Sequence, residues 1–456
     1  KTKSFPEQFT LSFLFFLSYN TESSLNDNFY THEGGNTDWL GFDDGTRNIP
    51  PAYTPGLFRD SILTGWTIDA TRHPYTTPGT DGELVSENNR NYAGYYEPTG
   101  EIMALKIGNA SKSFGGTQMM PSTTTSPLNQ KIGFSIGNQK QLFGRQLGFI
   151  FGVNYKRDFG FYENGSNSYF GISQDADNNY LLREEFAFSD TKGTESPQVT
   201  ALASIAYKLT NNTQVDFSYT YSHDADKESR TQVGQRENQL GSADLLNSHT
   251  LSFKERELQV SRMTLTQNIP SLNNTIIEAS GSFTKANELI PNLRQSAYIY
   301  NANFDQYSIQ ENSITSPSYF WRNLEDEQKQ AKVNITIPFL QEKSPSNKIK
   351  LGGLYSKKDR VYTEDFFSLV FPSQQPEGYI PFGSNENLED FYSESNFGVI
   401  NINENRLGTT KYYEFGNLIR YQSRPDGSNN NNYSGFEEIS ALYAMFTFNL
   451  TERLKV

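Results

Sequence analysis

Two short motifs in this chain have the residue types of known catalytic or nucleotide-binding sites. The segment Ser282–Lys285 matches the S-x-x-K motif, which pairs a serine nucleophile with a lysine. That chemistry needs a helix, whereas the surrounding alternation predicts a strand, on which positions three apart point to opposite faces. The segment Gly108–Ser113 is similar to a phosphate-binding loop but lacks the glycine before the lysine. Neither motif supports a catalytic residue.

Candidate metal ligands are equally sparse. The chain has no cysteine, which excludes disulfides, thiolate metal sites and cysteine catalysis. Asp175 with Asp177, and Asp224 with Asp226, place carboxylates two positions apart, and calcium prefers oxygen ligands. Neither pair has the glycine and downstream glutamate of an EF-hand loop, so we expect solvated loops. The histidines have no ligand spacing and are expected at the surface or in a lumen: His32, His73, His223 and His249. We expect no metal and no cofactor.

The elements that must position any site are strands of about ten residues in which apolar and polar side chains alternate. In the clearest one, Leu147–Tyr155, every second residue is apolar and the residues between include Gly148, Gly152 and Asn154. Successive side chains of a strand point to opposite faces, so one face suits an apolar medium and the other suits water. Repeated along a long chain, this pattern is typical of a membrane β-barrel with a wet interior.

The pattern predicts about ten complete strands and the start of an eleventh at Leu454. The expected strands lie at about 9–19, 130–136, 146–155, 199–207, 214–221, 251–268, 277–283, 333–339, 349–355 and 442–450. The connections alternate between short links and long polar segments, of which residues 21–128 form the first and longest. Outer-membrane barrels have short periplasmic turns and long extracellular loops. We therefore predict an all-β fold, an antiparallel transmembrane β-barrel.

Composition agrees with this prediction and excludes other classes. The mean hydropathy is -0.65, which is low for one large domain with a shared core. Aromatic residues nonetheless make up 14%, as expected for interfacial girdles. The net charge is -13, so nucleic acid is not an expected partner. The longest apolar run, Phe13–Leu17, is too short for a membrane-spanning helix.

Several segments resemble the barrel of TonB-dependent outer-membrane receptors. They occur in the expected order: Asp38–Arg47 with Ile49–Pro50, Pro291–Arg294, Pro338–Phe339, Lys348–Gly353 continuing to Lys358–Arg360, and Tyr433–Glu438. The resemblance implies a 22-stranded barrel, of which residues 1–456 are roughly the first half. The family's plug domain, its TonB-binding box and the C-terminal strands have no counterpart here, so we expect a fragment of a longer protein.

The resemblance also implies a function. Such a receptor captures a scarce ligand at its extracellular loops and imports it with energy relayed by TonB, without covalent chemistry. The implied partners are the TonB–ExbB–ExbD system, outer-membrane lipids and lipopolysaccharide, a siderophore, other small molecule or oligomer as ligand, and other outer-membrane proteins. The implied location is the outer membrane of a Gram-negative bacterium. Two alternatives remain: a receptor-type barrel serving as a structural subunit of a larger outer-membrane complex, and a soluble extracellular β-protein that binds glycans.

The segment around Trp39 is the best candidate site. Trp39, Asp43, Asp44 and Arg47 could contact a ligand or the plug. Alternatively the segment is an ordered loop with Trp39 and Phe42 buried and one of the two aspartates paired with Arg47. Six charged residues on the polar sides of the strands are expected in the lumen: Lys131, Asp216 and Lys332, with Lys156, Lys348 and Lys350.

Overall fold

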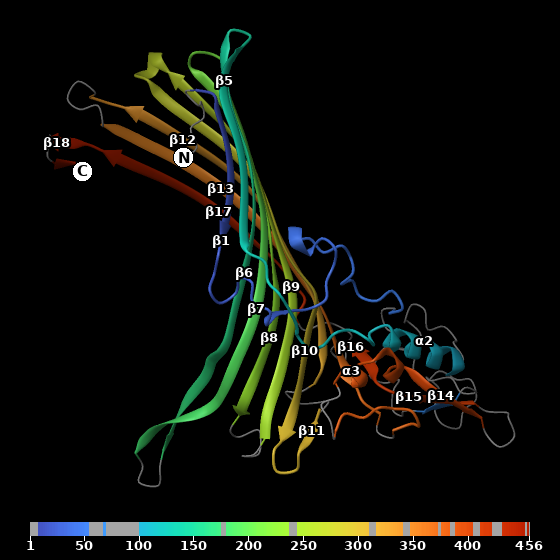
Figure 1. Cartoon of the computed structure of the whole chain (residues 1–456). Coiled ribbons are helices and arrows are strands. Elements are labelled where there is room, and N and C mark those ends of the chain that lie inside the picture. The colour runs from blue at the N-terminus through green and yellow to red at the C-terminus, as the bar shows by residue number, and fades with distance from the viewer. Residues whose placement is uncertain are drawn as a thin grey trace.

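The protein is built around one large antiparallel sheet that twists strongly along its length (Figure 1). The computed structural model describes residues 8–53, 67–69, 100–174, 179–236, 244–309, 316–340, 347–372, 375–383, 388–404, 411–421, 431–451 and 454–455. The strands follow chain order in the sheet, β1-β5-β6-β7-β8-β9-β10-β12-β13, and both β16 and β17 pair with β13. All-antiparallel pairing between successive strands confirms the predicted meander.

Ten strands of this sheet correspond to the ten predicted strands. Their bounds are β1 Thr10–Ser18, β5 Asn129–Leu142, β6 Arg145–Gln174, β7 Tyr180–Lys208, β8 Thr213–Arg236, β9 Asp244–Ile269, β10 Thr275–Asn301, β12 Ser318–Pro338, β13 Lys348–Val370 and β17 Tyr433–Thr447. Two short strands extend the sheet, β11 Gln306–Ser308 beside β10 and β16 Leu418–Tyr421 beside β13. The predicted start of an eleventh strand is part of a separate small hairpin, β18 Asn449–Thr451 with β19 Leu454–Lys455.

The strands are much longer than the predicted ones. β6 has 30 residues and β7 has 29, and β8 and β9 also extend into the next polar segment. The polar segments at 156–198 and 223–248, expected as long loops, are therefore mostly strand. The prediction was wrong there because charged residues occur on both faces of these segments, yet their backbones still pair as strands. Long connections do remain between β1 and β5 and between β13 and β17.

The turn between β5 and β6 shows why the short links are tight. Leu142 pairs with Arg145, so only two residues, Phe143 and Gly144, make the turn. Their φ angles are +50° and +73°. Two positive φ angles give a turn whose twist matches that of the flanking strands.

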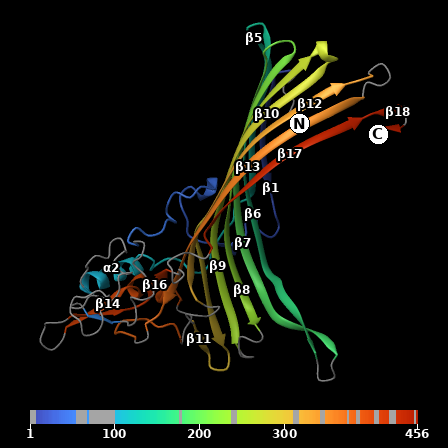
Figure 2. The same cartoon turned by 180° about the vertical axis from the view of Figure 1, so that it is seen from behind.

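Smaller elements come from the two long connections. The excursion between β1 and β5 contains β2 Phe29–Thr31, η1 Asp38–Leu40, β3 Thr67–Asp69, α2 Gly100–Lys112 and β4 Ser122–Thr124. The connection after β13 contains α3 Leu388–Phe391, η3 Glu394–Asn396, β14 Val399–Glu404 and β15 Lys411–Phe415, and η2 Pro270–Leu272 links β9 to β10. Figures 1 and 2 show α2 and its neighbours on one side of the sheet. Within the described residues no helix is long and apolar enough to cross a membrane.

The two faces of the sheet differ in character, and we call them face A and face B. Face A carries Phe217, and face B carries its neighbour Asp216. Near the short links, face A has an exposed apolar band made of Phe13, Phe134, Phe151, Ile205, Phe217, Met263, Phe283, Val333, Leu351 and Phe446. The strand register places the six predicted lumen residues together on face B. The predicted segregation of side chains is confirmed.

The main buried core lies away from this band. Helix α2, the segment after it and the connection after β13 pack against the far ends of β10, β12 and β13. Ile107 of α2, Phe114, Tyr319 and Phe367 are each no more than 2% exposed. This core fixes the excursion relative to the sheet.

Candidate functional site

The segment around Trp39 packs on face A, beyond the apolar band. His223 lies on β8 with the same parity as Phe217, and no register shift separates the two along β8. The imidazole of His223 stacks on Phe42 at 3.8 Å, with the rings within 9° of parallel. A ring nitrogen of His223 is 2.6 Å from the carbonyl oxygen of Gly41. Face A is therefore exposed near the short links, whereas the excursion covers it near the long connections.

A buried cluster of charges holds the segment together. Arg47 is bound to Asp38 at 2.6 Å and to Asp43 at 3.0 Å, and all three side chains are under 10% exposed. Lys227 of β8 also reaches Asp38, at 3.0 Å. The guanidinium of Arg47 lies 4.0 Å above the centre of the Phe253 ring on β9. The segment is thus tied to two strands of face A.

The local electrostatics favour the charged forms. Burial raises the pKa of Asp38, but Arg47 and Lys227 lower it more, so its pKa is below the ordinary value. Burial lowers the pKa of Arg47, but Asp38 and Asp43 raise it above the ordinary value. A buried ion pair that gains extra hydrogen bonds in this way is costly to break.

The predicted site residues are only partly brought together. Arg47 pairs with Asp43, as expected for an ordered loop, and also with Asp38. Asp44 instead accepts hydrogen bonds from the backbone N–H groups of Asn36 and Thr46. Trp39 is 48% exposed, so the expectation that it is buried was wrong. Its ring stands edge-on to Tyr155, whose hydroxyl donates to the Trp39 carbonyl at 2.6 Å.

A second set of contacts anchors the excursion to β10 and β12. Trp321 donates its indole N–H to the carbonyl oxygen of Arg47 at 2.7 Å. Arg294 donates to the carbonyl of Gln118 at 2.6 Å. Its guanidinium is also 3.1 Å from the carboxylate of Glu33. These bonds run across segments more than 170 residues apart in the chain.

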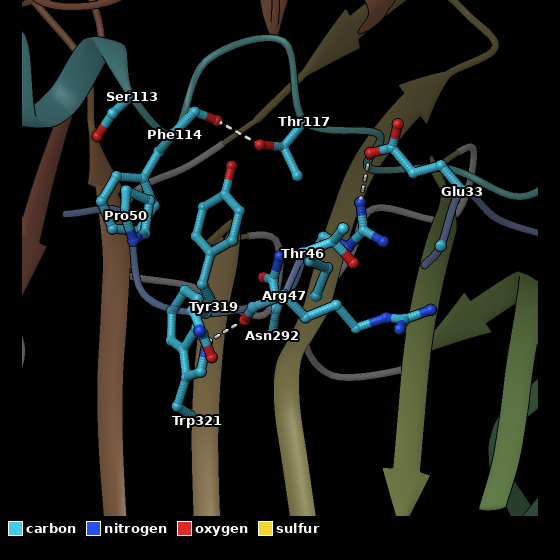
Figure 3. A pocket seen from close by; sticks show the side chains of 13 residues that line it. Glu33, Thr46, Arg47, Pro50, Ser113, Phe114, Thr117, Asn292, Tyr319 and Trp321 are labelled. Atoms are coloured by element: carbon cyan, nitrogen blue, oxygen red, sulfur yellow. Dashed lines mark hydrogen bonds and ion pairs between the residues drawn. The ribbon is translucent and has the colours of Figure 1, made fainter. Parts of the chain in front are cut away.

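A cavity of about 310 Å³ lies between these anchors (Figure 3). The excursion supplies one wall and β10 and β12 supply the other. The lining residues are Glu33, Gly34, Thr46, Arg47, Asn48, Pro50, Ser113, Phe114, Thr117, Asn292, Arg294, Tyr319 and Trp321. Of the predicted site residues, only Arg47 lines it.

A β-bulge in β10 brings Arg294 to this cavity. The register against β9 shifts between Leu289 and Arg294, and the register against β12 shifts between Ile290 and Leu293. Before the bulge the even-numbered Glu288 lies on face B, whereas after it Arg294 pairs with Tyr319 on face A. Asn292 in the bulge has φ +53°, a conformation that asparagine tolerates better than most residues. Bulges are common beside functional sites, where they redirect side chains.

Sequence reasoning missed Arg294, Tyr319 and Asn292. In the sequence Pro291–Arg294 stands out only through its resemblance to a receptor barrel, and a bulge has no reliable pattern in a single sequence. The partners of Arg294 come from residues 33 and 118, which alternation cannot place beside it.

The structure places the other candidate residues in structural roles. Ser282 and Lys285 lie on strand β10 and on opposite faces, as predicted. Asp224 and Asp226 are bound to Arg256 at 2.9 and 2.5 Å, not left in a solvated loop.

Three histidines are buried, contrary to expectation, because the excursion or a neighbouring strand covers them: His32, His223 and His249. His73, Asp175 and Asp177 lie outside the described residues. Among the described residues no cluster of three or more histidine, aspartate or glutamate side chains could hold a metal.

Comparison of the chain with protein-family models, curated proteins and solved structures finds no match.

Proposed function

We propose that the chain is the barrel part of an outer-membrane, TonB-dependent receptor of a Gram-negative bacterium. In this proposal the short links face the periplasm and the excursion faces the outside. The receptor takes up a scarce ligand with energy relayed by the TonB–ExbB–ExbD system, and it carries out no covalent chemistry.

The observation that carries the proposal is the exposed apolar band on face A. Phe217 is 44% exposed and Phe446 is 65% exposed, and within the described residues no second layer covers the band. Monomeric soluble proteins rarely expose a contiguous apolar patch across a whole sheet. Hydrocarbon outside and water inside account for face A and for the charged face B at once.

The edges of the sheet set a further requirement. β1 and β17 are the outer strands, and each carries large exposed apolar side chains, such as Phe13 and Leu442. Unpaired strand edges are not stable in lipid. The proposal therefore requires additional strands that pair with β1 and β17 and close the barrel.

The absence of cysteine allows a direct test of the membrane part. Phe217→Cys and Ser218→Cys place one thiol each on faces A and B at the same level. We expect a polarity-sensitive fluorophore on residue 217 to be quenched by brominated lipids after reconstitution, and the same fluorophore on residue 218 to be unaffected. Equal quenching at both positions, or none at either, contradicts the proposal.

A second experiment tests transport. Cells that make the whole protein, cells that lack it and cells that lack TonB are compared for uptake from a panel of scarce nutrients. We expect loss of the protein and loss of TonB to abolish uptake of the same compound. A defect in envelope assembly without any shared uptake defect favours the structural-subunit alternative. Recovery of the protein in the aqueous extracellular fraction rejects both the receptor and the structural-subunit hypotheses.

A further inference from the structure

The cavity between the excursion and strands β10 and β12 is lined by residues with polar groups that have no partner among the described residues. The hydroxyl of Tyr319 makes no hydrogen bond within the part of the chain that the structure describes, although this residue is only 1% exposed. The same holds for Nε of Arg294, Nε of Arg47 and Oδ1 of Asn292. Buried polar groups are nearly always paired, because leaving them unpaired is costly. All four atoms belong to residues that line one cavity, although the guanidinium of Arg47 is directed towards Asp38, Asp43 and Phe253. The unpartnered groups of Tyr319, Arg294 and Asn292 indicate that something else binds there.

The balance of donors and acceptors indicates what that is. Three of the four unpartnered groups can donate, namely Tyr319, Arg294 and Arg47, whereas Asn292 Oδ1 only accepts. A molecule bound between Tyr319 and Arg294 must therefore present acceptor atoms to both. A carboxylate does so, and it is the natural partner of a guanidinium and a phenol.

The charge balance limits the ligand to one negative charge. Arg47 is already neutralised by Asp38 and Asp43. Arg294 is 3% exposed, and its carboxylate partner Glu33 is 59% exposed and therefore well solvated. Burial lowers the pKa of Arg294 despite Glu33. A further anion beside Arg294 would therefore stabilise its charged form. A dianion such as phosphate would exceed what one partly neutralised arginine offers.

One wall of the cavity is flat and aromatic, whereas Thr46, Asn48, Ser113 and Thr117 line the rest. Phe114 stands edge-on to both Tyr319 and Trp321, at 5.5 and 6.1 Å between ring centres. Pro50 completes this side (Figure 3). A volume of about 310 Å³ is at the small end of ligand pockets. It suits a single ring with a short polar group.

We propose that this cavity binds a small organic monoanion, with its carboxylate bound by Tyr319 and Arg294 and its flat apolar body against Trp321 and Phe114. The bulge at Asn292 exists to bring Arg294 to the site. The inference goes beyond the proposed function and does not depend on transport.

The test uses the purified full chain, with benzoate and phenylacetate as probes and their neutral amides as matched ligand controls. Binding is followed by titration calorimetry and by the fluorescence of the tryptophans. We expect at least one acid to bind, and its amide to bind at least tenfold more weakly. Equal binding of acid and amide overturns the proposal, as does the absence of binding by both acids at millimolar concentration, which leaves water as the only occupant.

The decisive variant is Tyr319→Phe, because it removes a hydroxyl that no described protein group binds. We expect the acid to bind at least fivefold more weakly while the melting temperature is unchanged or higher. The control is Tyr298→Phe, a buried tyrosine of β10 outside the cavity, whose hydroxyl is bonded to Asn247. It should lower stability and leave acid binding intact. Unchanged acid binding in Tyr319→Phe, or a clear loss of stability, rejects the site.

Discussion

Arg47 and Asp38 form a buried ion pair, with Nη2 of the arginine 2.6 Å from Oδ2 of the aspartate. The two residues are nine positions apart, and Asp38 is the first residue of the 3-10 turn η1. Lys227 of β8 binds the same carboxylate, so one aspartate both closes the loop and attaches it to the sheet.

Replacing this aspartate should release the excursion. Asp38→Asn leaves Arg47 and Lys227 buried with less compensating charge, and breaking such a pair costs about 3 kcal/mol. We expect faster hydrogen exchange over residues 33–48, with the large sheet unchanged. The control is Asp359→Asn, which breaks an exposed pair with Lys357 and should alter stability by less than about 0.5 kcal/mol. Equal exchange in both variants contradicts the assignment.

A glycine of β7 should be needed for the excursion to approach the sheet. A Cβ at Gly193 would lie 2.1 Å from the backbone oxygen of Tyr30 in β2, whereas a Cβ at Gly160 of β6 would meet nothing within 4 Å. Gly193→Ala should therefore cost about 1–3 kcal/mol by forcing β2 away, and Gly160→Ala should be tolerated. Thermal unfolding of the two variants makes the comparison. A smaller loss for Gly193→Ala than for Gly160→Ala would place β2 elsewhere.

Stability should fall as the pH drops below about 6.5. Burial lowers the pKa of His249 to about 4, and burial lowers that of His32 as well. The unfolded chain takes up a proton on each histidine below its ordinary pKa of about 6.5, whereas folded His249 stays neutral until about 4. His249 thus contributes up to about 3 kcal/mol that is present above pH 6.5 and lost towards pH 4.

This pH dependence is measured by denaturant unfolding at a series of pH values. His249→Gln should flatten the curve between pH 4 and 6.5 without removing the contribution of His32. A slope that is unchanged in this variant would mean that another group is responsible.

The two faces of the sheet should respond in opposite ways to a new charge. Ile205 is an exposed member of the apolar band, and Ser204 lies on face B beside it. In a lipid bilayer Ile205→Arg should cost about 2–4 kcal/mol, the value for an arginine facing lipid near the midplane. Ser204→Arg should cost much less. Folding titrations in lipid vesicles give the difference, and a greater cost for Ser204→Arg would reverse the assignment of the faces.

The sequence alone predicts the ten main strands and their order because apolar residues recur at every second position near each short link. It does not predict how far the strands continue. Beyond Tyr155 and Tyr221 charged residues occur on both faces, and such a segment looks like a loop in the sequence. The candidate site is predicted only in part: the pairing of Asp43 with Arg47 is local, whereas Asp38–Lys227 and Arg294–Glu33 join distant segments. The bulge at Asn292 changes the face of every later residue in β10. The alternation of apolar and polar residues in the sequence does not reveal it.

The length of the central strands has a further consequence. The 30 residues of β6 extend for about 100 Å at about 3.3 Å per residue. A strand needs only about 9–11 residues to cross a bilayer. In the proposed orientation much of β6 to β10 projects beyond the bilayer as an extended sheet. Molecules outside the cell would meet its tip before they reach the polysaccharide layer at its base.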